Sequence, residues 1–276
     1  MPEIPELEAI VGFFNGQLPG QQITAAATRI PPVFRTPAAE IRDTLPADTF
    51  TGLRRHGKFL LFDLQSGRTL AINPMLTGRF QYVDAGAQLP AKTCLVLDLG
   101  SGAQLRYADE RLMGKVYLLA ASDLDKIPNW AESGPDLLDP VLTEDEWLTR
   151  IRRYRGQIKN VLTNAAFVQG IGNAYSDEIL WEAGIHPAAK RTELADDDLR
   201  RLYRAAHAVI EWAIPLARQA MVHDFVLDYR ERRDFLHVHR RGGEPCPRCG
   251  AQISEITANQ RVTSFCRQCQ PGGHQR

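Results

Sequence analysis

Residues 246–269 read CPRCGAQISEITANQRVTSFCRQC and carry the most specific pattern in the sequence. Two CxxC pairs flank sixteen residues, so each pair can hold one side of a tetrahedral Zn²⁺ while the residues between them form a β-hairpin. A disulfide framework is the alternative, but the start of the chain lacks the basic and apolar segments of a signal peptide. The pattern therefore predicts a ribbon with one structural zinc. Its ligands would be Cys246, Cys249, Cys266 and Cys269.

Charge is balanced over the whole chain but uneven along it. There are 33 basic and 33 acidic residues, and a net charge of zero by itself argues against a nucleic-acid partner. Residues 230–276, however, hold nine arginines against four acidic residues, and further basic clusters lie at 54–58 and 150–159. Any one cluster is typical of a solvated surface. A phosphate contact is the alternative for Arg261, which lies inside the predicted hairpin.

Upstream of the ribbon the sequence changes from β-type to helical patterns. Residues 2–18 have apolar residues at helical spacing, and short β runs from about 22 to 120 suggest an antiparallel sandwich or barrel. Cys94 stands in one of these runs, TCLVLDL, and we expect it to be buried. A stretch rich in proline and acidic residues, 125–140, predicts a linker. Helical spacing then recurs at 144–154, 157–164, 173–183 and 195–217.

Two further segments suit particular chemistry but also have plain structural explanations. An α-amino group is the amine whose ordinary pKa, about 7.7 to 8.0, lies near neutrality, so Pro2 could attack a carbonyl-like carbon once the initiator methionine is removed. Pro2 and Glu3 equally suit the start of a helix. Gly170 and Gly172, ahead of Asn173, would let backbone amides approach an anion, although a plain turn between helices is the simpler explanation.

Together these segments resemble the formamidopyrimidine-DNA glycosylase and endonuclease VIII family. The resemblance covers the whole chain through six motifs in family order. They are MPEIPELE at the start, RRHGK at 54–58, MLTG at 75–78, DERLMG at 109–114, QGIGNAYSDEIL with AGIHP at 169–187, and the ribbon ending QRVTSFCRQCQ at 260–270. No single motif is decisive, but all six in this order identify the chain as a member.

The resemblance implies an α+β fold, with an N-terminal helix on an antiparallel β-sandwich, a helical helix-two-turn-helix domain and a C-terminal zinc ribbon. It implies a base-excision-repair enzyme that hydrolyses N-glycosyl bonds and has abasic-site lyase activity. The partner would be double-stranded DNA with a damaged base or abasic site, flipped toward Pro2. The expected domains are the catalytic domain 1–124, the linker 125–140, the helix-two-turn-helix domain 141–236 and the ribbon 237–271.

The family's catalytic roles transfer to the positions that match its motifs. By the resemblance, Pro2 attacks C1′ of the damaged nucleotide and forms a Schiff base, and Glu3 protonates the ring oxygen of the sugar. Lys58 matches the β-strand lysine that binds phosphate and assists elimination, and Arg261 matches the ribbon arginine of the δ-elimination step. The further phosphate contacts implied are Arg155 and Asn173.

Three residues match the trio that fills the hole left by the flipped nucleotide. Leu76 and Met113 would be apolar wedges, and Arg111 would contact the orphan base. Without the resemblance, Leu76 and Met113 would pass as ordinary core residues. The chain departs from the family pattern at Lys92, which stands where many members have a DNA-contacting histidine, and at Asn164, which replaces a common aspartate.

The segment 220–237 leaves the substrate open. It lacks the GGTT-like start and glycine-rich span of members directed at 8-oxoguanine, in which this loop closes over the flipped purine. Four classes of lesion remain candidates for the substrate: a formamidopyrimidine, 8-oxoguanine, an oxidised pyrimidine and a hydantoin. We expect a cytoplasmic, nucleoid-associated monomer without a membrane span, because no run of about eighteen apolar residues is present.

The alternative from another class is a non-catalytic binder of abasic or distorted DNA on the same fold. A binder that had lost its chemistry would be expected to lose at least one catalytic residue. The chain keeps Pro2, Glu3, Lys58 and Arg261, which favours the enzyme.

Overall fold

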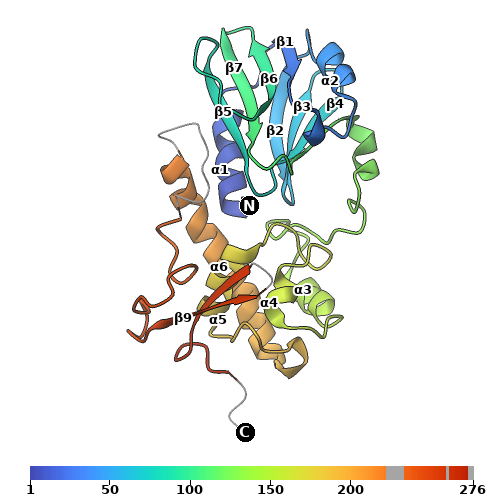
Figure 1. Ribbon diagram of the computed structural model, residues 1–276. Coiled ribbons are helices and arrows are strands. Elements are labelled where there is room, and N and C mark those ends of the chain that lie inside the picture. The colour runs from blue at the N-terminus through green and yellow to red at the C-terminus, as the bar shows by residue number, and fades with distance from the viewer. Residues whose placement is uncertain (222–232, 259–260, 273–276) are drawn as a thin grey trace. The chain divides into compact units, whose positions relative to one another are not determined.

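The computed structural model describes residues 1–221, 233–258 and 261–272, and the chain forms two compact units (Figure 1). Unit 1 contains Met1–Ala131 and the end of the last long helix, from Ile214. Unit 2 contains Glu132–Ala213 and the segment from Arg233 onward. Each unit buries a set of apolar residues of its own.

Unit 1 is an antiparallel β-sandwich against which helix α1 (Ile4–Asn15) packs. One sheet has the strand order β1-β6-β7-β5 and the other β2-β3-β4-β8. Apolar residues of both sheets fill the core, where Phe14 of α1 meets Phe62 and Phe80 edge-on. The strands are β1 (Ile23–Thr28), β2 (Phe50–His56), β3 (Phe59–Leu64), β4 (Arg68–Asn73), β5 (Gly78–Asp84), β6 (Thr93–Leu99), β7 (Ala103–Asp109) and β8 (Lys115–Ala120).

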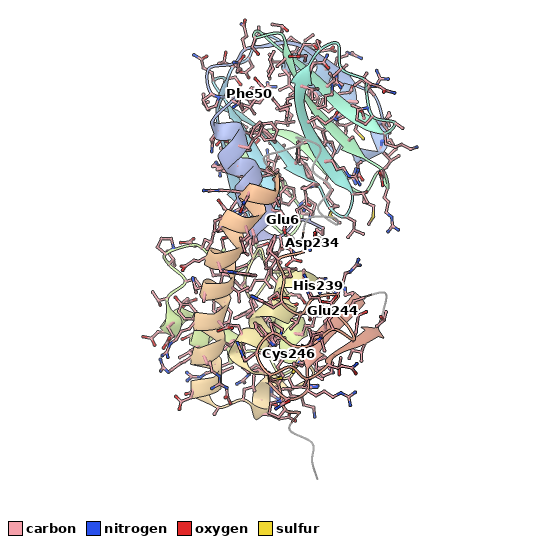
Figure 2. The ribbon with its side chains drawn as sticks, turned by 90° about the vertical axis from the view of Figure 1, so that its left-hand side faces the viewer. Glu6, Phe50, Asp234, His239, Glu244 and Cys246 are labelled. Atoms are coloured by element: carbon pink, nitrogen blue, oxygen red, sulfur yellow. The ribbon has the colours of Figure 1, made fainter. Side chains whose placement is uncertain are left out.

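Helix α1 is shorter at both ends than the predicted 2–18. It begins at Ile4 because Glu3 is extended, and the carboxylate of Glu6 accepts the backbone N–H of Glu3 at 2.9 Å. Glu6 is labelled on this helix in Figure 2. It ends at Asn15, whose side-chain amide exchanges two hydrogen bonds of 2.7 Å with the backbone of Leu53 on β2. A side chain therefore defines each end of α1, and the Asn15 side chain also ties the helix to β2.

Three short elements of unit 1 have no counterpart in the sequence prediction. They are η1 (Pro31–Val33), α2 (Ala38–Thr44) and η2 (Ala121–Lys126). Helix α2 spans only seven residues and buries only Ile41, so it lacks the repeated apolar spacing by which an amphipathic helix is recognised.

Unit 2 combines helices with a two-stranded hairpin. Its elements among the described residues are α3 (Glu144–Ile151), α4 (Ile158–Leu162), α5 (Asn173–Ala183), η3 (Arg191–Glu193), α6 (Asp196–Met221), β9 (Ile253–Ala258) and β10 (Arg261–Cys266). The hydroxyl of Thr143 caps α3, and Gly184 ends α5 in the left-handed region at φ +67°. Helix α6 continues past Ile214 into unit 1, where Met221 packs against the sandwich core.

The predicted α+β fold is confirmed, including the antiparallel sandwich and the hairpin of the ribbon. Cys94 lies on β6 and is fully buried, which raises the pKa of its thiol to about 11. No described helix is long and apolar enough to cross a membrane. The predicted domain limits stay predictions, and most of the 220–237 segment lies outside the described residues, from 222 to 232.

Candidate functional site

Residues 2 and 3 of the chain are buried where helix α1 begins. Pro2 is buried, and Glu3 is only 2% exposed at the beginning of α1. The guanidinium of Arg55 on β2 donates to the carboxylate of Glu8 at 2.8 Å and so ties α1 to the neighbouring strand. A nucleophile at residue 2 would therefore sit on a helix that is fixed along its length.

Lys58 lies in the turn between β2 and β3, and not on a strand as its family match implies. Gly57 adopts φ +55° there, and its carbonyl accepts a hydrogen bond of 3.0 Å from Arg55. On the same hairpin, His56 stacks on Trp130 with ring centres 4.0 Å apart. The turn thus places a half-buried lysine at the tip of a braced hairpin.

The expected DNA contacts of unit 1 meet at one end of the sheet β1-β6-β7-β5. Lys92 directly precedes β6, Leu76 lies two residues before β5, and Arg111 lies two residues after β7. Because neighbouring strands are antiparallel, the starts of β5 and β6 lie beside the end of β7. The backbone N–H of Asp109 at that end donates to the carbonyl of Lys92 at 3.0 Å. Three separate motifs are therefore brought together.

The exposure of these side chains suits contact with a partner. Met113 is 39% exposed, so it is not the core residue that its apolar character alone would suggest. Arg111 is exposed and Leu76 half-buried, whereas Leu112 packs against the sandwich core with φ +54°. The loop therefore presents Arg111 and Met113 on either side of a leucine that anchors it.

Asn173 and Arg261 line one pocket of unit 2, with a volume of about 550 Å³. The side-chain amide of Asn173, at the first position of α5, donates to the carbonyl of Val262 at 2.8 Å and joins the helix to β10 beside Arg261. Polar residues of α4 and its ends line the same pocket, namely Gln157, Lys159, Asn160 and Thr163. Arg155 is exposed ahead of α4 but is not among the residues that line this pocket.

A buried set of charged residues beside this pocket was missed by the sequence analysis. Lys159 is 8% exposed, and its ammonium donates to Asp177 at 2.6 Å and to the hydroxyl of Thr263 at 2.8 Å. The other carboxylate oxygen of Asp177 is 2.7 Å from Nδ1 of His239 and accepts the backbone N–H of Ser264 at 3.1 Å. Sequence gives no warning of this set because its members lie far apart along the chain.

Glu178, next to Asp177 on α5, holds the segment that leads into the ribbon. Its fully buried carboxylate accepts the backbone N–H groups of His237, Val238 and His239 at 2.8–2.9 Å. Hydrogen bonds to a buried carboxylate are among the stronger ones in proteins. Two adjacent carboxylates of α5 therefore attach the ribbon to the helical part of unit 2.

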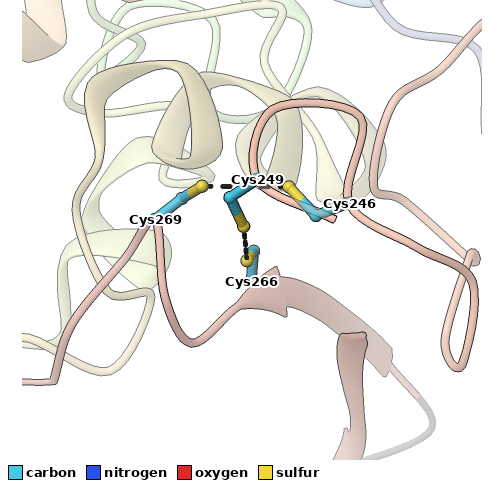
Figure 3. A group of neighbouring side chains, drawn as sticks. All are labelled: Cys246, Cys249, Cys266 and Cys269. Atoms are coloured by element: carbon cyan, nitrogen blue, oxygen red, sulfur yellow. Dashed lines mark hydrogen bonds between the residues drawn. The ribbon is translucent and has the colours of Figure 1, made fainter. Parts of the chain in front are cut away.

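The four predicted zinc ligands converge, with one sulfur atom from each lying within 4.8 Å of the others (Figure 3). The two closest approaches between CxxC pairs are Cys249–Cys266 at 3.4 Å and Cys246–Cys269 at 3.8 Å. Four thiolates at tetrahedral spacing are the donor set of a structural zinc. The site keeps no place for a substrate, so the metal would serve the fold of the ribbon.

Trp181 of α5 contacts this cluster directly. Its indole N–H donates to the sulfur of Cys246 at 3.4 Å, and the guanidinium of Arg248 lies 4.2 Å from its ring centre. Although burial opposes ionisation, the backbone N–H of Arg248 and the Trp181 indole lower the pKa of Cys246 to about 6. These donors favour the thiolate form that binds metal.

Family models match three successive parts of the chain. They are the formamidopyrimidine-DNA glycosylase N-terminal domain over residues 1–116, the H2TH domain of the same enzyme over 133–224, and the zinc finger found in FPG and IleRS over 243–272. A formamidopyrimidine-DNA glycosylase of Pelotomaculum thermopropionicum is 34% identical, and the match covers 98% of this chain and 99% of that protein. The chain belongs to the formamidopyrimidine-DNA glycosylase family.

Other members agree in sequence and in structure. The formamidopyrimidine-DNA glycosylase of Desulforamulus reducens is 36% identical over 98% of this chain and 99% of its own length. The Lactococcus lactis enzyme, solved with DNA that contains an abasic site, superposes with a TM-score of 0.88 at 26% identity, covering 98% of this chain and all of that one. The fold class, the family and one structural zinc are therefore confirmed.

Proposed function

We propose that this chain is a base-excision-repair DNA glycosylase with abasic-site lyase activity that uses the amine of Pro2 as its nucleophile. The observation that carries the proposal is the pair Pro2 and Glu3, buried at the start of a fixed helix in a chain that matches the family over its whole length. Related structures contain the same class of partner. The Lactococcus lactis enzyme was solved with DNA containing an abasic site or a formamidopyrimidine lesion.

The chemistry follows from a secondary amine next to a carboxyl group. The nitrogen of Pro2 bonds to C1′ as the N-glycosidic bond breaks, and the base leaves with a proton. A proton from Glu3 on the ring oxygen opens the sugar and gives an iminium ion. The iminium draws electrons from C2′, so loss of the C2′ proton expels the 3′ phosphate, and a second elimination expels the 5′ phosphate.

Cations on these phosphates lower the barrier to elimination because charge develops on the departing oxygens. We assign this role to Lys58 at its hairpin tip and to Arg261 at the pocket of unit 2. Asn173, in the same pocket, and the exposed Arg155 would bind neighbouring phosphates and so position the duplex without reading its sequence.

Leu76 and Met113 would occupy the space left by the flipped nucleotide, with Arg111 on the orphan base and Lys92 on the nearby backbone. Apolar side chains on two surface loops, with Met113 exposed and Leu76 half-buried, suit this task because they replace the stacking that the duplex loses. The substrate would be double-stranded DNA with a formamidopyrimidine, 8-oxoguanine, an oxidised pyrimidine or a hydantoin. We further propose that the protein acts as a monomer in the cytoplasm, on the nucleoid.

Borohydride trapping tests the proposal, because borohydride reduces an iminium to a stable adduct. Duplexes that each carry one of the four lesions or an abasic site are incubated with protein from which Met1 has been removed, so that Pro2 carries the free α-amine. A covalent adduct is expected on the abasic duplex and on the preferred lesion. Pro2→Gly should cut turnover about 100-fold, because a flexible glycine no longer holds the amine in line with C1′.

Pro5→Gly is the matched control, since Pro5 lies within the first turn of α1 and carries no free amine. It should trap normally once its stability is allowed for. Absence of an adduct on every duplex would favour the non-catalytic DNA binder. Equal loss of binding and turnover in Pro2→Gly would mean that Pro2 serves the fold.

A further inference from the structure

Asp109 is a buried carboxylate that has no role in the proposed chemistry. It is fully buried at the end of β7, where it accepts the hydroxyl of Thr77 and the backbone N–H groups of Gly114 at 2.6 Å and Arg111 at 3.2 Å. The Thr77 hydroxyl also accepts the N–H of Arg111, at 3.0 Å. Donors from two separate loops thus converge on one carboxylate.

These two loops are the ones that carry the wedge residues. Thr77 directly follows Leu76, while Arg111 and Gly114 flank Met113. Both loops hold a non-glycine residue in the left-handed region, Met75 at φ +50° and Leu112 at φ +54°. Such conformations persist where surrounding contacts over-determine them, and the Asp109 hydrogen bonds supply those contacts.

We call the place where these two loops meet Asp109 the junction. Close packing of the backbone stabilises it. A Cβ at Gly114 would lie 1.8 Å from the Tyr107 hydroxyl and 3.1 Å from the Asp109 carboxylate. A Cβ at Gly78 would lie 2.4 Å from the carbonyl of Pro74. A Cβ at Gly78 would also lie 2.6 Å from the Tyr107 hydroxyl. Only glycine fits at either position, so both loops pack their backbone against the same buried tyrosine.

We propose that Asp109, acting through Thr77, is a positioning residue that sets Leu76 against Arg111 and Met113 before DNA binds. The inference rests on the proposed function, in which these three residues fill the space of the flipped nucleotide. Preorganised groups avoid the cost of ordering during binding. The junction therefore matters where a stacked duplex must be opened, and not where the target is already unstacked.

The test compares two substrates and four variants, three at threonines and one at Asp109. Thr77→Val removes the hydroxyl at nearly constant volume, and Thr77→Ser restores it. Thr69→Val is the matched control, because the fully buried Thr69 on β4 also donates its hydroxyl to a carboxylate, Asp63, at 2.8 Å. Each protein is assayed on a lesion-containing duplex and on a single strand with an abasic site, which has no orphan base and no stack to open.

Loss of one hydrogen bond to a carboxylate predicts that Thr77→Val lowers kcat on the lesion duplex about tenfold, with lyase activity on the abasic single strand unchanged. Thr77→Ser should recover most of the loss, and Thr69→Val should show none. A second readout is 2-aminopurine placed opposite an abasic site. Its fluorescence change at saturating protein should shrink in Thr77→Val and return in Thr77→Ser.

Asp109→Asn keeps one acceptor oxygen and should show the same pattern more strongly, so a misfolded variant at one position leaves the other to decide. Equal activity of Thr77→Val and the parent protein on the lesion duplex, or an equal loss on both substrates, would overturn the inference. Failure of the proposed function has a different signature, since the parent protein would then cleave neither substrate.

Discussion

Among the described residues, the sandwich of unit 1 surrounds a core of 24 buried apolar residues, whereas the ribbon of unit 2 packs on a cluster of five, of which two are zinc ligands. The sandwich thus holds Leu76, Lys92, Arg111 and Met113 on strand ends that a large apolar core fixes. The ribbon holds Arg261 on a hairpin too small for such a core. The zinc site, the buried carboxylates of Asp177 and Glu178, and the Trp181 ring stabilise the ribbon in place of such a core. The sandwich and the ribbon should therefore unfold in different ways.

Loss of zinc should have the largest effect and should be confined to the ribbon. Cys266→Ser removes one of four ligands, and structural zinc contributes about 10–16 kcal/mol in small zinc-binding peptides, so we expect residues 246–269 to lose their structure. Hydrogen exchange by mass spectrometry should show rapid exchange there and unchanged protection in β2–β4.

Cys94→Ser is the matched control, because Cys94 is buried in the sandwich away from the metal. It should cost about 1–3 kcal/mol for burying a hydroxyl and leave the bound zinc in place. Ribbon amides that stay protected after verified zinc loss would contradict the comparison, and DNA affinity that is unchanged would remove Arg261 from the binding surface.

Removal of the Asp177 carboxylate should have the second largest effect, a loss of stability in unit 2. Asp177→Asn leaves the buried ammonium of Lys159 without its counter-charge, and breaking a buried ion pair costs about 3–5 kcal/mol. Urea unfolding of unit 2 measures the loss. The double variant Asp177→Leu with Lys159→Met should recover part of it, because both charges are then removed.

The matched control is the same aspartate-to-asparagine change at a partly exposed ion pair of the sandwich. Asp63 bridges Arg54, whose side chain is 50% exposed, so Asp63→Asn should cost less than about 1 kcal/mol. Equal losses at Asp63 and Asp177 would mean that the buried network contributes nothing particular to unit 2.

Substitution of Trp181 should lower the zinc affinity more than it lowers the stability of the fold. Trp181→Phe keeps an aromatic ring on α5 but removes the N–H that donates to Cys246, and partners of metal ligands are worth about 10–100-fold in metal affinity. Competition with a chromogenic chelator measures the change. Trp147→Phe is the control, because the buried Nε1 of Trp147 has no hydrogen-bond partner among the described residues, and its zinc affinity should equal that of the parent.

The smallest effect concerns acid stability. Burial lowers the pKa of His207 on α6, although Glu211 opposes the shift, and its Nε2 is buried without a partner within the described part of the chain. The unfolded chain then takes up the proton first, so stability is complete above pH 6.5 and falls as the pH drops below that value. His207→Phe should flatten this loss, by less than about 1 kcal/mol because the side chain is only half-buried.

Sequence alone predicted most of the elements, but it missed the short ones and several of the ends. Helix α5 occupies the predicted 173–183, because the glycines before and after it mark both ends. Helix α1 is shorter than predicted, since the exchange of hydrogen bonds between Asn15 and Leu53 joins residues 38 positions apart. Periodicity reports which face is apolar and says nothing of such distant partners.

By itself, the sequence determined the ribbon and its four ligands, because CxxC spacing encodes a metal site locally. It also determined the family, and with it Pro2, Glu3 and Lys58 as candidates for the chemistry. Only the tertiary structure brought Lys92, Leu76, Arg111 and Met113 to one sheet end, placed Asn173 beside Arg261, and gave Asp109, Asp177 and Trp181 their partners. These are contacts between strands and helices far apart in the chain, and spacing along a sequence does not encode them.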